Sequence, residues 1–373
     1  MDWLMYLGVP FLLSAAITPL IKKIACYLGI YAEMNERTVH TKVIARIGGV
    51  AIYVSFMIGM ACFMKVDASI NAIVLGGTIM FVGGLVDDMD NLKPIYKFGF
   101  QTLAAIVLMV VGDVYLEVIR LPFNITINMG LITFLVTFLW ITGITNAVNL
   151  IDGLDGLAGG LSVIILVVIA SLSVIEQRAD ISTLSLILAG GTLGFLIYNS
   201  HPASIFMGDC GALFLGFVIS AISLLGFKSS TLITLGLPIL MLTVPIVDTI
   251  SAILRRAAAG HKFSEADKNH LHHVLMRRFG HRNTVLILYG VTALFGVTAY
   301  VYIINKLAGL ITLFVIGVVI EIFIETSGMI APSYHPILSV LNRLKGKDSP
   351  DLLKVHPFEE DENKTKEEDE TAE

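Results

Sequence analysis

The sequence has few charged residues for its length. Charged side chains make up 15% of the 373 residues, whereas soluble proteins carry about 25%. Hydrophobic residues make up 55%, and the mean hydropathy is +0.82. These values exclude an ordinary soluble domain, and they also exclude a disordered chain, which would be poor in apolar residues. They fit a protein that crosses a membrane several times, since each helical crossing takes about 20 apolar residues.

Cysteine is also scarce. The three cysteines are Cys26, Cys62 and Cys210, and their wide spacing argues against a disulfide framework and a thiolate metal site. The formal net charge of −5 arises at the end of the chain, where nine acids and two lysines follow Phe358. The acidic total therefore describes a solvated tail, which we expect to be disordered from residue 359. No nucleic-acid partner is expected.

Eleven long apolar runs are candidate membrane helices. They cover residues 3–21, 47–64, 69–86, 96–112, 129–148, 157–175, 181–198, 210–227, 229–254, 284–304 and 307–325. The expected fold class is therefore an all-α polytopic membrane protein with about eleven transmembrane helices. Residues 1–325 would form the transmembrane domain, and residues 326–373 a cytosolic tail.

The distribution of Lys and Arg predicts the orientation of these helices, because cytosolic connections carry the excess of basic residues. With the N-terminus outside, the cytosolic connections and tail hold 20 basic residues and the outer connections hold 5. The expected topology is N-terminus outside and C-terminus cytosolic. One outer connection, residues 114–129, is rich in β-branched residues and contains Pro122 and Asn124, which favours a short external β-hairpin.

The polar motifs fall in the cytosolic connections. Asp87, Asp88 and Asp90 stand at the end of one apolar run, and Lys93 and Lys97 follow them. Adjacent carboxylates with nearby lysines suit a metal-bound phosphate site, in which the acids hold the cation and the lysines neutralise phosphate. The alternative is that the three acids only end a helix at the water interface.

A second connection carries Asn146, Asn149, Asp152 and Asp155 at intervals of three residues. This spacing can gather amide and carboxylate oxygens on one side of a turn, and two glycines permit close approach of a ligand. The connection lacks a basic residue, so a cation or a donor-rich ligand is expected. The alternative is a loop of ordinary turn-forming residues.

Two further connections contain candidate ligands. In the first, Asp209 lies between glycines just before an uncharged helix, where it could also act as a helix cap. The second spans residues 255–282 and combines many cations with His270, His272, His273 and His281. These histidines could bind pyrophosphate or a metal, and the carboxylate-rich loops elsewhere favour Mg²⁺ over zinc. A positive-inside anchor would explain the arginines but not the histidines.

Together, the segments DDMD, NAVNLIDGLDGL, FMGDCG and HLHH, in this order, resemble the polyprenyl-phosphate N-acetylhexosamine-1-phosphate transferases. These membrane enzymes move a sugar 1-phosphate from a UDP-sugar to a lipid phosphate and release UMP. The resemblance covers residues 1–325, which would form a transmembrane catalytic domain with cytosolic active-site loops. The early segment 40–49 also resembles the family, but no role is assigned to it.

The resemblance implies a role for each matching residue. The metal would be Mg²⁺, with Mn²⁺ as a substitute, held by Asp209 with Asn149 beside it. Asp87 and Asp88 would be the catalytic acid pair, and Lys97 a phosphate contact. Asp155 and Phe206 would contact the uracil, and Asp152 and Asn199 would line the nucleotide pocket. The residues implied at the pyrophosphate or sugar are His270, His272, His273 and Arg278. Of these, His272 would also be catalytic.

The last histidine segment indicates the branch of the family. The branch that transfers phospho-MurNAc-pentapeptide usually has three consecutive histidines, and here Leu271 interrupts them. With the following segment 276–280, this is similar to the branch that starts teichoic acid, the O-antigen of lipopolysaccharide or related cell-envelope glycans. The resemblance implies UDP-GlcNAc and undecaprenyl phosphate as substrates, in the first membrane step of such a glycan. The expected location is the bacterial inner membrane, with the active site on the cytosolic face. Phospho-MurNAc-pentapeptide transfer by the same chemistry is the alternative, and the sequence leaves a homodimer open.

A rival from another class is a secondary transporter. Transporters place their coupling charges near the middle of the bilayer, in repeated halves. Here the acids cluster at cytosolic ends and no matching halves are found, which favours the enzyme. For the enzyme, we expect direct attack by the lipid phosphate. That phosphate is largely ionised at pH 7, so Asp87 could be a base, a nucleophile or a positioning group.

Overall fold

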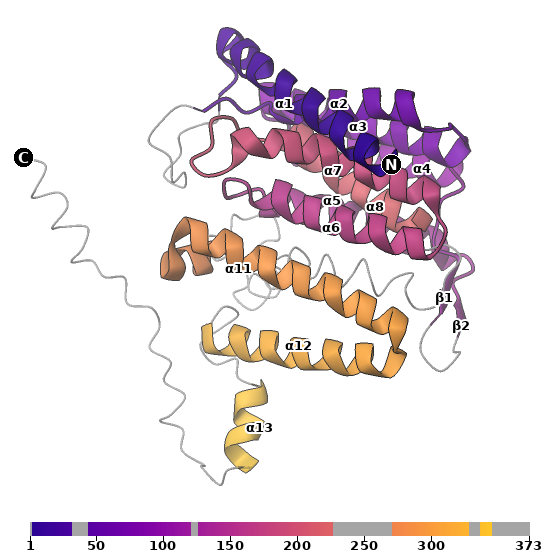
Figure 1. Ribbon diagram of the computed structural model, residues 1–373, viewed down its shortest axis with the longest axis vertical. Helices are drawn as coiled ribbons and strands as arrows, with labels where there is room; N and C mark the ends of the chain where they lie inside the picture. Colours follow the sequence, from indigo (N-terminus) through magenta and orange to yellow (C-terminus); the bar gives the residue numbers. More distant parts are fainter. Residues whose placement is uncertain (1, 32–43, 121–125, 227–270, 328–335, 345–373) are drawn as a thin grey trace, which may run out of the picture.

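The computed structural model describes residues 2–31, 44–120, 126–226, 271–327 and 336–344. Within these ranges it contains eleven helices and one two-stranded sheet (Figure 1). The helices are α1 (Asp2–Leu28), α2 (Gly49–Phe63), α3 (Ala68–Asp90), α4 (Pro94–Val110), α5 (Ile132–Ile151), α6 (Leu157–Ile175), α7 (Ala179–Asn199), α8 (Gly208–Gly226), α11 (Leu271–Ile304), α12 (Lys306–Ser327) and α13 (Pro336–Leu344), and the strands are β1 (Val118–Arg120) and β2 (Thr126–Asn128).

The all-α expectation is confirmed. Ten of the eleven apolar runs coincide with helices α1–α8, α11 and α12, and the run at 229–254 lies outside the described residues. In the described part of the chain, seven helices are long and apolar enough to cross a membrane: α1, α3, α5, α6, α7, α8 and most of α11. Helices α2 and α4 are apolar but shorter, with 15 and 17 residues. The total of eleven crossings, their orientation and the division at residue 325 stay predictions.

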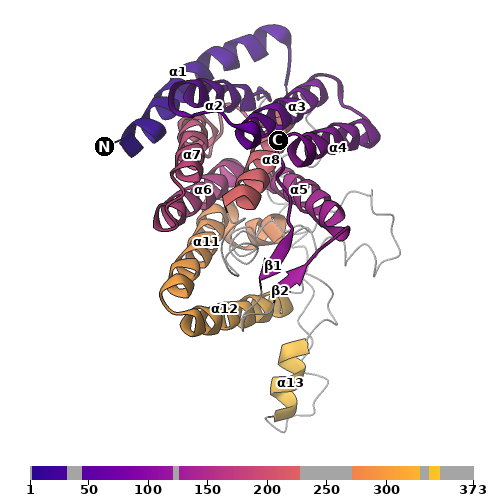
Figure 2. The same cartoon turned by 90° about the vertical axis from the view of Figure 1, so that its right-hand side faces the viewer.

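Helix α8 forms the centre of the bundle. In its apolar stretch 94% of the residues are buried, against 22% in α1. Helices α3 and α5 pack directly against α8, and α2, α6 and α7 also touch it (Figure 2). Small residues allow this close packing: a Cβ added at Gly216 would lie 2.7 Å from the Cα of Thr145 on α5. Helix α8, which begins at Gly208, is therefore held in place by helices on several sides.

Helix α11 contains a kink. Gly280 has φ 72° and ψ 170°, which is not helical, so the helix changes direction there. The part that follows packs against α6, and α12 packs back against α11 (Figure 1). The kink places His281 at the start of the straight segment that leads into the bundle.

The predicted β-hairpin is confirmed, and its place outside the membrane stays a prediction. Strands β1 and β2 are antiparallel, with Ile119 opposite Ile127. The backbone N–H of Leu116, just before β1, donates to Thr137 Oγ1 on α5 at 3.0 Å, which anchors the hairpin to the bundle. Because the hairpin joins the end of α4 to the start of α5, it lies at the opposite end of the bundle from the α3–α4 connection (Figure 1).

Candidate functional site

Polar side chains gather where α3, α5 and α7 end and where α4, α6 and α8 begin. They form two groups. We call the first the carboxylate centre, which consists of Arg46, Asp87, Asp88, Lys97, Asn149 and Asp209. We call the second the histidine cluster, which consists of Asp155, His201 and His281.

The segment before α2 brings Arg46 to the start of α8. The N–H of Phe206 donates to Ala45 O, and the N–H of Gly48 donates to Phe206 O, both at 2.8 Å. Gly208, the first residue of α8, has φ 76°, and a Cβ there would lie 2.0 Å from Arg46 O. Only glycine fits this position, because both the backbone angle and the close approach exclude a side chain.

Asp88 holds the first turn of α8. Its Oδ1 accepts the N–H of Asp209 and its Oδ2 accepts the N–H of Cys210, each at 2.9 Å. Its Oδ1 is also 3.1 Å from Nε of Arg46, and the side chain has 0% exposure. A buried carboxylate that accepts the unpaired N–H groups of a helix start is favoured by the helix dipole. These contacts fit a positioning residue for Asp209.

Lys97 joins the other two carboxylates. Its Nζ lies 2.6 Å from Asp87 Oδ2 and 2.9 Å from Asp209 Oδ2. The second oxygen of Asp87 accepts the N–H of Leu92 at 2.8 Å, which fixes Asp87 against the turn between α3 and α4. Lys97 stands in the first turn of α4 and its side chain is 32% exposed, so the ammonium group lies at the edge of the site.

Asp209 is the shared member of the centre. Its Oδ1 accepts hydrogen bonds from Arg46 and from Nδ2 of Asn149, both at 3.1 Å. Three carboxylates thus meet two cations, which leaves one uncompensated negative charge. Burial lowers the pKa of the Arg46 guanidinium, but Asp88, Asp209 and Asp87 outweigh this effect and raise that pKa above its ordinary value.

The residues of the carboxylate centre fit a hard divalent cation. Their donors are carboxylate and amide oxygens, which Mg²⁺ prefers. In the structure Arg46 and Lys97 supply the positive charge at Asp209. A divalent ion at Asp209 would therefore have to replace at least one of these contacts.

The asparagine and aspartate repeat does not converge on one point. Asn146 pairs with Gln101 of α4 through two amide hydrogen bonds of 2.9 and 3.0 Å. Asn149 reaches Asp209, while Asp155 lies in the histidine cluster. The expectation that these side chains line one side of a turn is therefore wrong for Asn146, because the helical continuation of α5 turns it toward α4.

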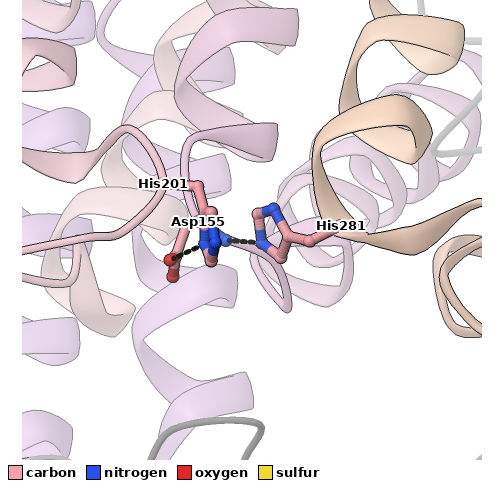
Figure 3. A group of neighbouring side chains, drawn as sticks. All are labelled: Asp155, His201 and His281. Carbon is pink, nitrogen blue, oxygen red and sulfur yellow. Dashed lines mark hydrogen bonds and ion pairs between the residues drawn. The ribbon is translucent and has the colours of Figure 1, made fainter.

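The histidine cluster joins three segments that are distant in sequence (Figure 3). Asp155 is buried, and its Oδ2 accepts the N–H of Ala203 at 3.0 Å and lies 2.8 Å from Nδ1 of His201. The N–H of Asp155 donates to Nε2 of His281 at 3.1 Å. The two imidazole rings stack, with centroids 4.1 Å apart and an interplanar angle of 25°.

Asn199 braces the loop that carries Asp155. It is buried, its Oδ1 accepts the N–H of Gly156 at 3.1 Å, and its Nδ2 donates to Ile205 O at 3.0 Å. Gly156 has φ 77° and its carbonyl accepts the hydroxyl of Tyr289 at 2.5 Å. Asn199 thus ties the loop that carries Asp155 to the segment between α7 and α8.

Asp152 lies between the carboxylate centre and the histidine cluster. Burial raises its pKa well above the usual range, and the negative charges of Asp209, Asp88 and Asp155 add to this effect while Arg46 opposes it. The side chain is partly exposed. Asp152 is therefore close enough to feel the charges of both groups.

The remaining predicted residues stand as follows. Phe206 is half-buried, and both its backbone groups pair with the segment before α2. Arg278 is exposed, with its guanidinium 5.6 Å from the ring of Phe279, and within the described ranges no hydrogen bond or ion pair links it to either group. His270 lies outside the described residues, as do the side chains of His272 and His273.

Sequence reasoning missed two features of the site. Arg46 was seen in a segment without an assigned role, although its pairing with Asp88 and Asp209 makes it a full member of the centre. His201 was not singled out, and His281 was grouped with the histidines of the preceding loop. A signal for His281 exists in Gly280, which interrupts the helix just before it.

The sequence is similar to several known proteins. The profile of glycosyl transferase family 4 matches residues 70–227. A probable undecaprenyl-phosphate N-acetylglucosaminyl 1-phosphate transferase of Bacillus subtilis is 40% identical over 337 residues, which cover 88% of this chain and 93% of that protein. A decaprenyl-phosphate N-acetylglucosaminephosphotransferase of Mycolicibacterium smegmatis is 33% identical, covering 74% of this chain and 77% of its own length.

A more distant relative is a phospho-N-acetylmuramoyl-pentapeptide-transferase of Listeria monocytogenes. It is 29% identical over 182 residues, which cover 48% of this chain and 54% of that protein. The Bacillus subtilis relative spans nearly the whole of both chains at an identity that shows common descent. The chain therefore belongs to the polyprenyl-phosphate N-acetylhexosamine-1-phosphate transferase family, and it is an enzyme, a glycosyl-1-phosphate transferase.

Proposed function

We propose that the protein transfers N-acetylglucosamine 1-phosphate from UDP-GlcNAc to undecaprenyl phosphate and releases UMP. The observation that carries this proposal is the carboxylate centre, where Asp209 pairs with Arg46 and Lys97. These two cationic side chains can instead bind the phosphate oxygens of a substrate. The names of the relatives from Bacillus subtilis and Mycolicibacterium smegmatis support N-acetylglucosamine as the sugar and a polyprenyl phosphate as the acceptor.

The reaction is a direct displacement at phosphorus. An oxygen of the lipid phosphate attacks the β-phosphorus of UDP-GlcNAc, and the bond from that phosphorus to the bridging oxygen breaks, so that UMP leaves with the oxygen. Since the second pKa of a phosphate monoester is about 6, the attacking oxygen is already ionised at pH 7. Asp87, which is held by Lys97 and Leu92, then serves to position Lys97 rather than to remove a proton.

Asp209 and Asn149 would hold a Mg²⁺ ion, for which Mn²⁺ could substitute. When bound, the ion supplies positive charge that stabilises the charge on the departing UMP. Arg46 and Lys97 can turn from Asp209 toward the phosphates and neutralise their oxygens. Asp88 keeps Asp209 in place through the backbone of α8.

The nucleotide would lie toward the histidine cluster. Asp155 can accept a hydrogen bond from the uracil, and the half-buried ring of Phe206 offers a surface on which the base stacks. Asp152 stands between this position and the carboxylate centre, as expected for a residue near the ribose or the pyrophosphate. His270, His272, His273 and Arg278 are proposed for the pyrophosphate and the sugar.

The proposed location is the bacterial inner membrane with the site facing the cytosol. The 20 basic residues in the connections on the side of the site, against 5 on the other, support this orientation. The product lipid would start a cell-envelope glycan such as teichoic acid or O-antigen. UDP-GlcNAc is soluble and would reach the site from the cytosol. Undecaprenyl phosphate would reach it by diffusing in the bilayer.

The choice of donor tests this proposal. Purified protein in detergent, with Mg²⁺ and undecaprenyl phosphate, is given either UDP-GlcNAc or UDP-MurNAc-pentapeptide, and UMP is measured. We expect UMP only from UDP-GlcNAc and only when the lipid is present. Release from the pentapeptide donor alone would assign the chain to the other branch.

A further inference from the structure

We propose that Asp155, His201 and His281 form a binding site for a zinc ion, separate from the carboxylate centre. Each residue offers one ligand atom, and the three atoms lie within 4.8 Å of one another. They come from the α5–α6 connection, the α7–α8 connection and the straight part of α11 (Figure 3). A bound ion would therefore tie these three segments together.

The hydrogen bonds indicate where the protons of the two rings lie. Nε2 of His281 accepts the N–H of Asp155 at 3.1 Å, so this nitrogen carries a lone pair rather than a proton, and the ring would have to turn from that N–H to bind an ion. Nδ1 of His201 faces Oδ2 of Asp155 at 2.8 Å, so one proton lies between two potential ligand atoms. A metal ion takes the place of that proton, as it does when metal binding releases protons elsewhere.

The site also has the supporting contacts that metal ligands require. The carboxylate of Asp155 is held by the N–H of Ala203 at 3.0 Å, and hydrogen-bonded carboxylates are typical of metal sites. The Asp155 side chain is 1% exposed and that of His201 is 45% exposed. An ion can therefore enter past His201 and reach a buried carboxylate.

The ligand set selects the metal. Two imidazoles and one carboxylate suit zinc, whereas Mg²⁺ and Ca²⁺ take oxygen ligands. Tetrahedral ligands at about 2.0–2.1 Å from zinc stand about 3.3 Å apart, so the contact between His201 and Asp155 would open by about half an ångström. Three protein ligands leave a fourth position for water. The carboxylate-rich loops of the sequence favour Mg²⁺ over zinc, but in the structure His281 follows the kink at Gly280 and contacts Asp155.

Zinc at this position would compete with the nucleotide. This consequence rests on the proposed function, which gives Asp155 to the uracil. Zinc added to the enzyme should then raise the apparent KM for UDP-GlcNAc. The binding of zinc itself does not depend on the proposed function, and it can be measured without either substrate.

The test is a zinc titration of the full chain in detergent after removal of metals, read by competition with a fluorescent chelator. To remove other histidine ligands, His270, His272 and His273 are first changed to Gln in one background variant. This background should bind one zinc ion per chain. Adding His201→Gln or His281→Gln should weaken that binding by about tenfold or more. Arg282→Gln, a change at the exposed residue next to His281, is the matched control and should bind zinc as the background does.

A second measurement uses the unaltered chain, so it does not depend on whether the variants fold. Diethylpyrocarbonate modifies unliganded imidazoles, so zinc should protect His201 and His281 of the unaltered chain from modification, as read by mass spectrometry. Equal zinc affinity in the two histidine variants and their background would overturn the proposal, and so would unchanged modification of both residues in the presence of zinc. Neither result would argue against the proposed transferase function, because both measurements are made without substrate.

Discussion

Asp88 of α3 accepts the backbone N–H groups of Asp209 and Cys210, both at 2.9 Å. One carboxylate therefore sets the position of another that lies 121 residues away in sequence. Because the side chain of Asp88 is buried and also pairs with Arg46, its effect on the reaction should pass through Asp209 rather than through the substrate.

Replacing Asp88 by Asn should disturb the first turn of α8. An amide has one acceptor oxygen, so one of the two N–H groups loses its partner, which costs about 1–3 kcal/mol in a buried position. Misplacement of a catalytic group by about 1 Å costs roughly 100-fold in rate, and we expect a loss of kcat of that order with a lowered Tm. The exposed neighbour Asp90→Asn is the control, and equal activity of the two variants would contradict the positioning role.

A close approach of α3 to α8 at Gly84 provides a test that removes no polar group. A Cβ at Gly84 would lie 2.4 Å from the carbonyl oxygen of Asp209 and 2.5 Å from its carbonyl carbon. Gly84→Ala should therefore push the start of α8 away, with a cost of about 1–3 kcal/mol in stability and a loss of activity like that of Asp88→Asn.

Gly99 on α4 is the matched control for this change, because nothing lies within 4 Å of a Cβ added there. Gly99→Ala should keep the activity and gain slightly in stability, since alanine is the better helix former. A fully active Gly84→Ala enzyme would show that the position of Asp209 tolerates displacement.

In the proposed function, Arg46 would compete with Mg²⁺ for Asp209. Removing its guanidinium in Arg46→Ala should tighten Mg²⁺ binding in the absence of substrate, because Oδ1 of Asp209 loses a cation at 3.1 Å. The same change should raise the KM for UDP-GlcNAc by about tenfold, the equivalent of one charge-assisted hydrogen bond. Calorimetry with Mg²⁺ and steady-state kinetics measure the two effects separately. Parallel loss of both affinities would mean that Arg46 holds the fold of the centre instead.

Direct displacement can be separated from a phospho-enzyme route. Asp87 is bound by Lys97 and by the N–H of Leu92, which leaves it poorly placed as a nucleophile. UDP-GlcNAc labelled in its sugar phosphate should therefore leave no label on the protein when undecaprenyl phosphate is withheld. A covalent label on Asp87 under these conditions would establish the two-step route.

The sequence predicted the helices well because the bilayer fixes their length and composition. Ten apolar runs are helices, and the run at 157–175 matches α6 to the residue. The charged loops between apolar runs also predicted which helix ends lie on the same side of the membrane. On that basis, one side was expected to hold Asp87, Asp88, Lys97, Asn149 and Asp209. The structure confirms that they meet.

Pairings across the bundle could not be predicted in the same way. Helices that are apolar on every face carry no signal for rotation about their axes, so nothing indicated that Asn146 faces Gln101 or that Arg46 reaches Asp88. The contact between Asp155 and His281 spans 126 residues and depends on the kink at Gly280. Such contacts follow from the packing of distant segments rather than from local pattern.

Asp209 is the residue on which the account depends most. The direct test is UMP release from UDP-GlcNAc by purified protein with undecaprenyl phosphate, measured over a range of Mg²⁺ concentrations for the unaltered enzyme and for Asp209→Asn. We predict that the unaltered enzyme forms UMP in a Mg²⁺-dependent manner and that the folded variant loses this activity. Normal activity with an unchanged Mg²⁺ dependence in Asp209→Asn would contradict it.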